Sequence, residues 1–279
     1  MIKRFYLIVI ALTFAFMASA QRGTYTSWEQ REANVKQMFY SLEMLEDNDQ
    51  ITRVADTIMR EMMEIVKDVE FNFGTEFKNL PNVGCVVSDD QNLCMYTWNV
   101  PLRDANNTSQ FYALCYSKVY DVVYAFSQGN PRVPAEKGTI AQTDWYGAMY
   151  YRIIPVKVKE STGYLLLGYA PIDNNRQYKV IDVMMCNKRG VKFGSNLFVK
   201  ENGKKFSRIV FEYGRSVQMS LEYDSKKKKI LYDHLTQMSV DENGKPIMGP
   251  DMSVDAFVLK GGLWVYMKDL NVKNPREDK

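Results

Sequence analysis

The chain has 279 residues, in which 36 lysines and arginines nearly balance 33 acidic residues, and it contains a single histidine. A chain of this length can bury a core in one large domain or two smaller ones. Its nearly neutral charge gives no overall attraction to nucleic acid or to anionic lipid. One histidine excludes metal centres built from several imidazoles, and we expect neither a metal nor a cofactor.

Residues 1–20 predict a cleaved signal peptide. Lys3 and Arg4 precede an uncharged, mostly apolar run over 5–17, and Ala18-Ser19-Ala20 supplies the small residues that a signal peptidase recognises. The run is too short for a membrane span of about 20 residues. We therefore expect an exported protein, periplasmic or beyond, that starts at Gln21 and has no transmembrane span. Removal of the signal leaves 34 basic and 33 acidic residues, a net charge of +1.

Residues 21–75 predict an α-helical hairpin. Thr26 with Glu29, and Ser27 with Gln30, fit the capping-box pattern at the start of a first helix that extends to about Leu45. The acidic run over 46–49 breaks this helix and can cap a second one. The second helix has an apolar stripe at the spacing of one helical face, made of Ile51, Val54, Ala55, Ile58, Met62, Ile65, Val66 and Val69.

Residues 76–279 predict a β-rich domain, so the fold class is mainly β with an N-terminal helical hairpin. About a dozen short strands separated by turn signals indicate an antiparallel meander, with a sandwich, a barrel and a propeller-like sheet all open. No helix-length run separates the strands, which disfavours parallel βαβ units. Pro155, within a predicted strand over 150–158, indicates an edge strand or a bulge. The run Lys226–Lys229 predicts a solvated hairpin turn, with a binding patch for an anionic polymer as the alternative.

The four cysteines fall into two groups. Cys85 and Cys94 flank a turn signal over 88–91, and a two-residue turn at Asp89-Asp90 would place them directly opposite each other. A cross-strand disulfide and a pair of buried reduced thiols both fit this pattern. Cys115 and Cys186 lie in apolar runs and are expected in the core. No C-x-x-C motif is present.

A series of motifs resembles an uncharacterised family of exported, signal-peptide-bearing proteins of the Bacteroidetes. The resemblance covers most of residues 83–274 and implies an envelope or exported location in a Gram-negative bacterium, but supplies no catalytic residues. Val254 departs from the family pattern, in which an aromatic residue is usual. The motifs are V87-SDDQNLCMYTW-N99, YYRIIP from 150, LLLGY from 165, VIDV from 180, RIVFEY from 208, YDHL from 232 and GPDMSVDAF from 249.

The stretch over 232–257 is the best candidate for a local site because it holds the only histidine and several acids. The candidate binding residues are Asp233, His234, Asp251 and Asp255, together with Glu212. A Ser-His-Asp triad is disfavoured because no G-x-S-x-G motif occurs and neighbouring Asp233 and His234 would point to opposite faces of a strand. Asp251 and Asp255 could bind a hard cation, or could bond backbone amides after Pro250. The segment 241–245 predicts a polar turn rather than a calcium loop.

Three functional hypotheses follow. The leading one is a non-enzymatic β-domain that binds or scaffolds an envelope partner, either a protein or a glycan, and not nucleic acid. The second is a carbohydrate-active hydrolase with a carboxylate pair drawn from Asp182, Glu212, Asp233, Asp251 and Asp255. The third is a peptide- or glycan-binding module with exposed aromatic residues. Trp98, Trp145 and Trp264 would then form a stacking platform, although cross-strand packing in the core explains them as well.

Overall fold

The structure, a computed structural model, describes residues 27–129 and 132–268. The chain divides into two compact units between Val83 and Gly84. The sequence placed the boundary at 75/76, but residues 76–83 form turns that belong to the first unit. The predicted signal peptide and its cleavage point before Gln21 lie outside the described residues.

The first unit contains two helices in contact, α2 (Trp28–Met44) and α3 (Asn48–Val66). Asp47 caps α3 as expected, because its side chain accepts a hydrogen bond from the Gln50 amide at 2.8 Å. The capping box predicted for the first helix is wrong at Ser27, whose side chain makes no capping hydrogen bond. Neither helix in the described part of the chain has the length and apolarity needed to cross a membrane.

The predicted apolar stripe of α3 is largely buried, but it ends sooner than expected. Ile51, Ala55, Ile58, Met62 and Ile65 are at most 1% exposed. Val69, by contrast, lies beyond the last helical residue and is completely exposed. The periodicity of apolar residues therefore located the buried face correctly and overran the end of the helix.

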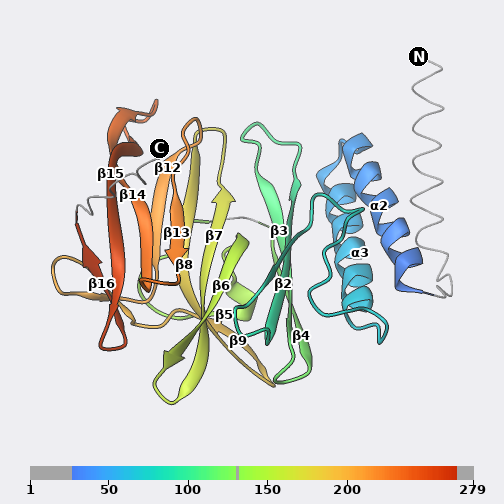
Figure 1. Cartoon of the computed structure of the whole chain (residues 1–279). Helices are drawn as coiled ribbons and strands as arrows, with labels where there is room; N and C mark the ends of the chain where they lie inside the picture. The colour runs from blue at the N-terminus through green and yellow to red at the C-terminus, as the bar shows by residue number, and fades with distance from the viewer. Residues whose placement is uncertain (1–26, 130–131, 269–279) are drawn as a thin grey trace, which may run out of the picture. The chain divides into compact units, whose positions relative to one another are not determined.

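The described residues of the second unit form three sheets, here named sheets A, B and C (Figure 1). Sheet A has the order β1 (Gly84–Val87), β2 (Leu93–Pro101), β3 (Ser109–Ser117), β4 (Val122–Gln128). Sheet B has the order β5 (Ile140–Ala141), β9 (Gly190–Phe193), β8 (Arg176–Asn187), β7 (Ser161–Pro171), β6 (Met149–Val158), and β12 (Ile209–Gly214) also pairs with β8. Sheet C has the order β11 (Lys205–Phe206), β10 (Phe198–Val199), β16 (Leu263–Met267), β15 (Pro246–Lys260), β14 (Lys229–Val240), β13 (Leu221–Asp224).

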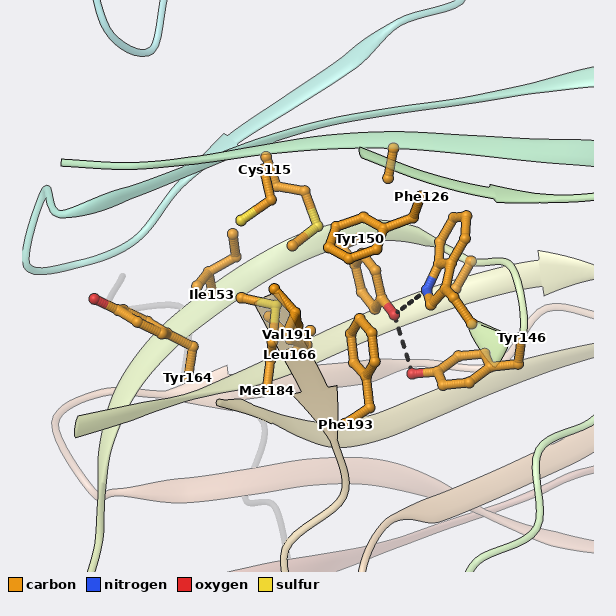
Figure 2. Close-up of a cluster of buried hydrophobic side chains, with 14 of the residues drawn as sticks. Cys115, Phe126, Tyr146, Tyr150, Ile153, Tyr164, Leu166, Met184, Val191 and Phe193 are labelled. Atoms are coloured by element: carbon orange, nitrogen blue, oxygen red, sulfur yellow. Dashed lines mark hydrogen bonds between the residues drawn. The ribbon is translucent and has the colours of Figure 1, made fainter. Parts of the chain in front are cut away.

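Sheet B is the central layer of this unit. Along β7, Tyr164 and Leu166 join an apolar cluster shared with sheet A, whereas Leu165 and Leu167 join a second cluster shared with sheet C. Figure 2 shows part of the first cluster, with Leu166, Met184 and Phe193 from sheet B and Cys115 and Phe126 from sheet A. Because β7 is buried on both faces, its sequence is a continuous apolar run rather than an alternating one.

The expectation of a mainly β, antiparallel fold is confirmed, and the strands form stacked sheets rather than a closed barrel. Among the described residues, every strand pair is antiparallel except β10 with β16. The strand with Pro155 is β6, an edge of sheet B with a bulge between Tyr150 and Arg152, as predicted. The lysine run forms the β13–β14 turn.

The side chains assigned to the core are found there. Trp98, Trp145 and Trp264 are at most 1% exposed, so they cannot form a stacking platform for a ligand. Cys115 and Cys186 are also buried. The apolar run over 256–259 predicts a short strand, but β15 begins ten residues before that run, at Pro246.

Candidate functional site

The histidine lies at an irregularity between the two longest strands of sheet C. Asp233 of β14 pairs with Val254 of β15, but Leu235 pairs with Pro250, so the register shifts at His234. Three residues of β15, at 251–253, are accommodated opposite the histidine. Met252 among them has a φ of +71° and is almost fully exposed. Such bulges re-aim side chains at a strand, and here the irregular stretch includes the histidine.

His234 and Asp255 form a hydrogen-bonded pair. Nδ1 of His234 lies 2.8 Å from Oδ2 of Asp255, and the Tyr266 hydroxyl of β16 donates to the same oxygen at 2.9 Å. The Asp255 side chain is only 2% exposed, whereas that of His234 is 36% exposed. The cluster therefore has a buried carboxylate with its partners and a partly accessible imidazole.

This geometry determines the chemistry that the imidazole can perform. A carboxylate accepts hydrogen bonds, so a neutral His234 must carry its proton on Nδ1 to donate to Asp255. Nε2 is then the acceptor. This nitrogen can accept a proton or a hydrogen bond from a ligand that approaches the bulge. We therefore regard His234, Asp255 and Tyr266 as the candidate site.

Asp251 lies near this pair but makes its own local bonds. Its Oδ1 accepts hydrogen bonds from the Ser253 amide at 3.0 Å and from the Ser253 hydroxyl at 2.6 Å. The bonds from the Ser253 hydroxyl and amide hold the pKa of Asp251 below its usual value, and a positive charge on His234, when the imidazole is protonated, acts in the same direction. Asp251 thus bonds a backbone amide after Pro250, as the sequence suggested. Asp255 bonds side chains of two neighbouring strands, His234 and Tyr266.

The two remaining candidates are held elsewhere by other partners. Glu212 of β12 bonds Arg176 at 3.2 Å and Lys245 at 2.7 Å. Asp233 accepts a hydrogen bond from the Ser220 amide at 2.7 Å. Of the five predicted residues, the structure therefore brings His234 and Asp255 into contact, with Asp251 within electrostatic reach. In the described ranges, no group of three or more histidine, cysteine or acidic side chains could hold a metal ion.

Comparison with protein-family models, with curated proteins and with solved structures finds no match for this chain. The resemblance to exported proteins of the Bacteroidetes therefore stays an expectation from the sequence. The site has to be interpreted from its own geometry.

A second polar centre lies inside the β unit and was not recognised from the sequence. Asp182 of β8 and Arg208, just before β12, form an ion pair at 2.8 Å, and both side chains are 0% exposed. The Tyr146 hydroxyl bonds the same carboxylate at 3.1 Å. It also accepts a bond from the Tyr150 hydroxyl at 3.0 Å, which Figure 2 shows among apolar side chains. Because neither charge reaches solvent, this centre stabilises the fold and cannot bind an external substrate.

The guanidinium of Arg208 also fastens a loop to sheet B. It donates to the carbonyl oxygens of Ala135 at 2.5 Å and Gly138 at 3.2 Å. The backbone amides of Ser207 and Arg208 donate to the carbonyl of Glu136. A buried arginine with a carboxylate and two carbonyl partners satisfies most of its donors. Asp182, one of the acids proposed for a hydrolase, is thus a structural residue.

The sequence contained a signal for both buried carboxylates. Asp182 interrupts the apolar run Val180-Ile-Asp-Val183, and Asp255 interrupts the run over 254–259. A charge in the middle of a buried strand requires a partner, so each aspartate indicated a buried pair. The partners Arg208, His234 and Tyr266 come from other parts of the chain, so the local pattern could not identify them.

Beyond the histidine, β14 and β15 continue as a two-stranded arm over residues 235–253. One face of the arm is anchored, since Leu235 and Met248 pack on the apolar cluster between sheets B and C, and Lys245 bonds Glu212. Farther along β14, the side chains are exposed to solvent. All five residues from Thr236 to Val240 are exposed, including Met238 at 58%.

The arm also has a backbone edge without a neighbouring strand. On its outer side β14 pairs with β13 only from Lys229 to Tyr232, and Asp233 adds one bond to Ser220. From Leu235 to Val240, β14 pairs with β15 alone within the described part of the chain. Peptide groups on such an edge can pair with another extended chain.

Proposed function

We propose that this chain is an exported cell-envelope protein without enzymatic activity, which binds or scaffolds a partner protein through the β14–β15 arm. The observation that carries the proposal is the open edge of β14 beside exposed apolar side chains. An extended segment of a partner could add to this edge as a further strand, with main-chain hydrogen bonds for affinity and side-chain contacts for specificity.

Three features of the arm support a contact surface rather than a weak point of the fold. Its inner face is anchored by Leu235 and Met248, so the open edge is held in place. Beyond these anchors, Met238 and Val240 are 58% and 53% exposed, and Met252 is 99% exposed at the bulge. Methionine is a frequent residue of adaptable binding surfaces. His234 lies at the base of the arm and could accept a hydrogen bond from the same partner.

A hydrolase that uses a carboxylate pair is the weaker candidate. Such an enzyme needs two carboxyl groups about 5–10 Å apart on either side of an open cleft. Glu212 instead bonds two cationic side chains, Asp182 is completely buried, and Asp255 is bonded to His234 and Tyr266. These interactions account for the three acidic side chains, so no catalytic role is needed to explain them.

The test is capture of a partner by the tagged chain from residue 21 onward, from an envelope extract of the source cells. The arm variant carries Met238→Asp and Val240→Asp, which place charges on the proposed contact face. The matched control is Val119→Asp, because Val119 is similarly exposed, at 59%, but lies between β3 and β4. We expect recovery of the specific partner to fall about tenfold or more in the arm variant, which corresponds to about 1.4 kcal/mol, and to be unchanged in the control.

Two results would contradict the proposal. One is equal recovery of the same partner by the arm variant and by the wild type, once circular dichroism shows both to be folded. The other is turnover of a glycoside or ester substrate by the purified chain that is abolished by Asp255→Asn, which would favour the hydrolase. If the partner proves to be a glycan, the binding role would stand, but the proposal that a partner strand adds to β14 would be wrong.

A further inference from the structure

Two cysteine side chains meet on neighbouring strands of sheet A. The Sγ atoms of Cys85 on β1 and Cys94 on β2 lie 3.7 Å apart. Their Cα partners are Tyr96 and Val87 respectively, so the two cysteines are diagonal neighbours and not directly opposite each other. The expectation of direct opposition was wrong because the turn has more than two residues: Ser88 donates to Leu93, and Gln91 adopts a φ of +58°.

The two thiols differ in accessibility. Cys85 is half-buried, whereas Cys94 is 0% exposed. The hydrogen bond with Cys85, followed by burial, raises the pKa of the Cys94 thiol. A reagent in solution therefore meets Cys85 first, and Cys94 is protected unless its partner has already reacted.

The position of Cys85 on an edge strand permits the sulfurs to approach. A disulfide requires about 2.05 Å between them, so the strands must shift from the 3.7 Å separation. Strand β1 has only four residues and pairs on one side only, with β2. Strand β2 is held between β1 and β3. A small displacement of β1, which also contacts β6, can therefore close the gap without breaking a second ladder of strand hydrogen bonds.

We propose that Cys85 and Cys94 form a reversible dithiol–disulfide site, in which Cys85 reacts first and Cys94 resolves the intermediate. The inference does not depend on the proposed binding role, since it concerns sheet A alone. It adds a modification site to a protein whose arm lies on sheet C.

The oxidant is a disulfide compound supplied from outside the protein, and the exchange is balanced in two steps. The Cys85 thiolate attacks one sulfur of the compound, forms a mixed disulfide and releases one thiolate of the compound. Cys94 then loses its proton and attacks Sγ of Cys85, which releases the second thiolate. The two protein sulfurs are oxidised by two electrons, and the compound is reduced to two thiols. A dithiol reductant reverses the sequence.

The experiment treats the folded, reduced chain from residue 21 onward with oxidised glutathione and maps the products by mass. Cys85 and Cys94 lie on one tryptic peptide, residues 79–103, which has no internal lysine or arginine. We expect this peptide to lose two hydrogen atoms and become resistant to alkylation, and to regain both alkylation sites after reduction. Cys115 and Cys186 should remain reduced.

Single substitutions test the order of reaction. Cys94→Ser should accumulate a stable glutathione adduct on Cys85, and Cys85→Ser should react at least about tenfold more slowly at Cys94, because that thiol is buried. Cys115→Ser is the matched control and should oxidise like the wild type. A wild-type chain that keeps both thiols, or that stops at the adduct on Cys85 while the unfolded chain forms the disulfide, would overturn the proposal.

Discussion

Asp182 and Arg208 place opposite charges in the interior of the β unit, where both are completely shielded from solvent. Transfer of either charge alone from water into such a site is costly, and the pair persists because each group has further hydrogen-bond partners. The carboxylate accepts from the Val183 amide and from the Tyr146 hydroxyl. Removal of either Asp182 or Arg208 alone should therefore lower the free energy of unfolding more than removal of both.

We expect Asp182→Ala to lower the free energy of unfolding by about 3–5 kcal/mol at pH 7, because it removes the carboxyl group that bonds the buried guanidinium, the Val183 amide and the Tyr146 hydroxyl. Denaturant unfolding of the purified chain measures this. The double variant Asp182→Ala/Arg208→Met is the control. Its loss in free energy of unfolding should be clearly smaller than the sum of the losses in the two single variants. Additive losses would indicate that the charges do not interact.

Asp182 also predicts a pH dependence. Burial raises its pKa to about 6, although Arg208 acts in the opposite direction. A carboxyl with a raised pKa binds its proton more tightly in the folded state than in the unfolded one. Its contribution to stability is therefore present below pH 4 and is lost as the pH rises to about 6.

The measurement is the difference in free energy of unfolding between wild type and Asp182→Asn, across pH 4 to 7. The advantage of the wild type should decrease with rising pH by roughly 3 kcal/mol, since one pKa unit corresponds to about 1.4 kcal/mol. Comparison of the two chains cancels the other titrating groups. A constant difference would mean that Asp182 does not titrate in this range.

Gly194 approaches the same buried pair more closely than any side chain could. Its φ is +97°, and a Cβ there would lie 2.5 Å from Nη2 of Arg208 and 2.6 Å from the Gly138 oxygen. We expect Gly194→Ala to lower the free energy of unfolding by at least about 2 kcal/mol. Gly138 is the matched control, because its φ is also positive but no atom lies within 4 Å. Gly138→Ala should cost only about 1 kcal/mol.

At the scale of single elements, the two helices of the first unit begin in different ways. The Asp47 side chain bonds the Gln50 amide, whereas Ser27 makes no side-chain capping bond. We expect Asp47→Ala to lower the free energy of unfolding by about 1 kcal/mol through loss of the cap. Ser27→Ala should change it by less than about 0.5 kcal/mol. Thermal unfolding of the two variants and the wild type measures these changes. Equal losses of stability in the two variants would contradict the assignment of Asp47 as a cap and of Ser27 as a residue without a capping bond.

Strand β15 is the element that most affects the candidate site. It spans Pro246–Lys260, and its first ten residues contain Gly249, Pro250 and Ser253, which are typical of turns. Local preference therefore favours a turn around Gly249-Pro250. The long partner β14 imposes a strand instead, and the excess residues over 251–253 are taken up in a bulge. This bulge is where His234 meets Asp255.

At the scale of the whole β unit, the central layer links two separate cores. Leu166 belongs to the cluster between sheets A and B, and both faces of its strand are buried. We expect Leu166→Ala to lower the free energy of unfolding by about 2–5 kcal/mol, from lost burial and the cavity left behind. Val119→Ala, at an exposed site, should have an effect below about 0.5 kcal/mol. Urea unfolding tests both, and a small effect at Leu166 would contradict a tightly packed central layer.

The amino-acid sequence alone determined the class of the fold and much of its core. Periodicity over Ile51–Val66 located a helix, and alternating or continuous apolar runs located most strands, because burial imposes a regular spacing on each element. The buried tryptophans, the edge position of Pro155 and the polar turns at 226–229 and 241–245 followed from local chemistry.

Only the tertiary structure decided which side chains meet. Asp255 pairs with His234, and Cys85 lies diagonal to Cys94, because turn length and bulges set the register between strands, and a shift of one residue changes every pair. Arg208 reaches Asp182 across 26 residues of sequence for the same reason. Contacts between strands depend on register and on the stacking of sheets, and neither is encoded in the spacing of residues within one strand.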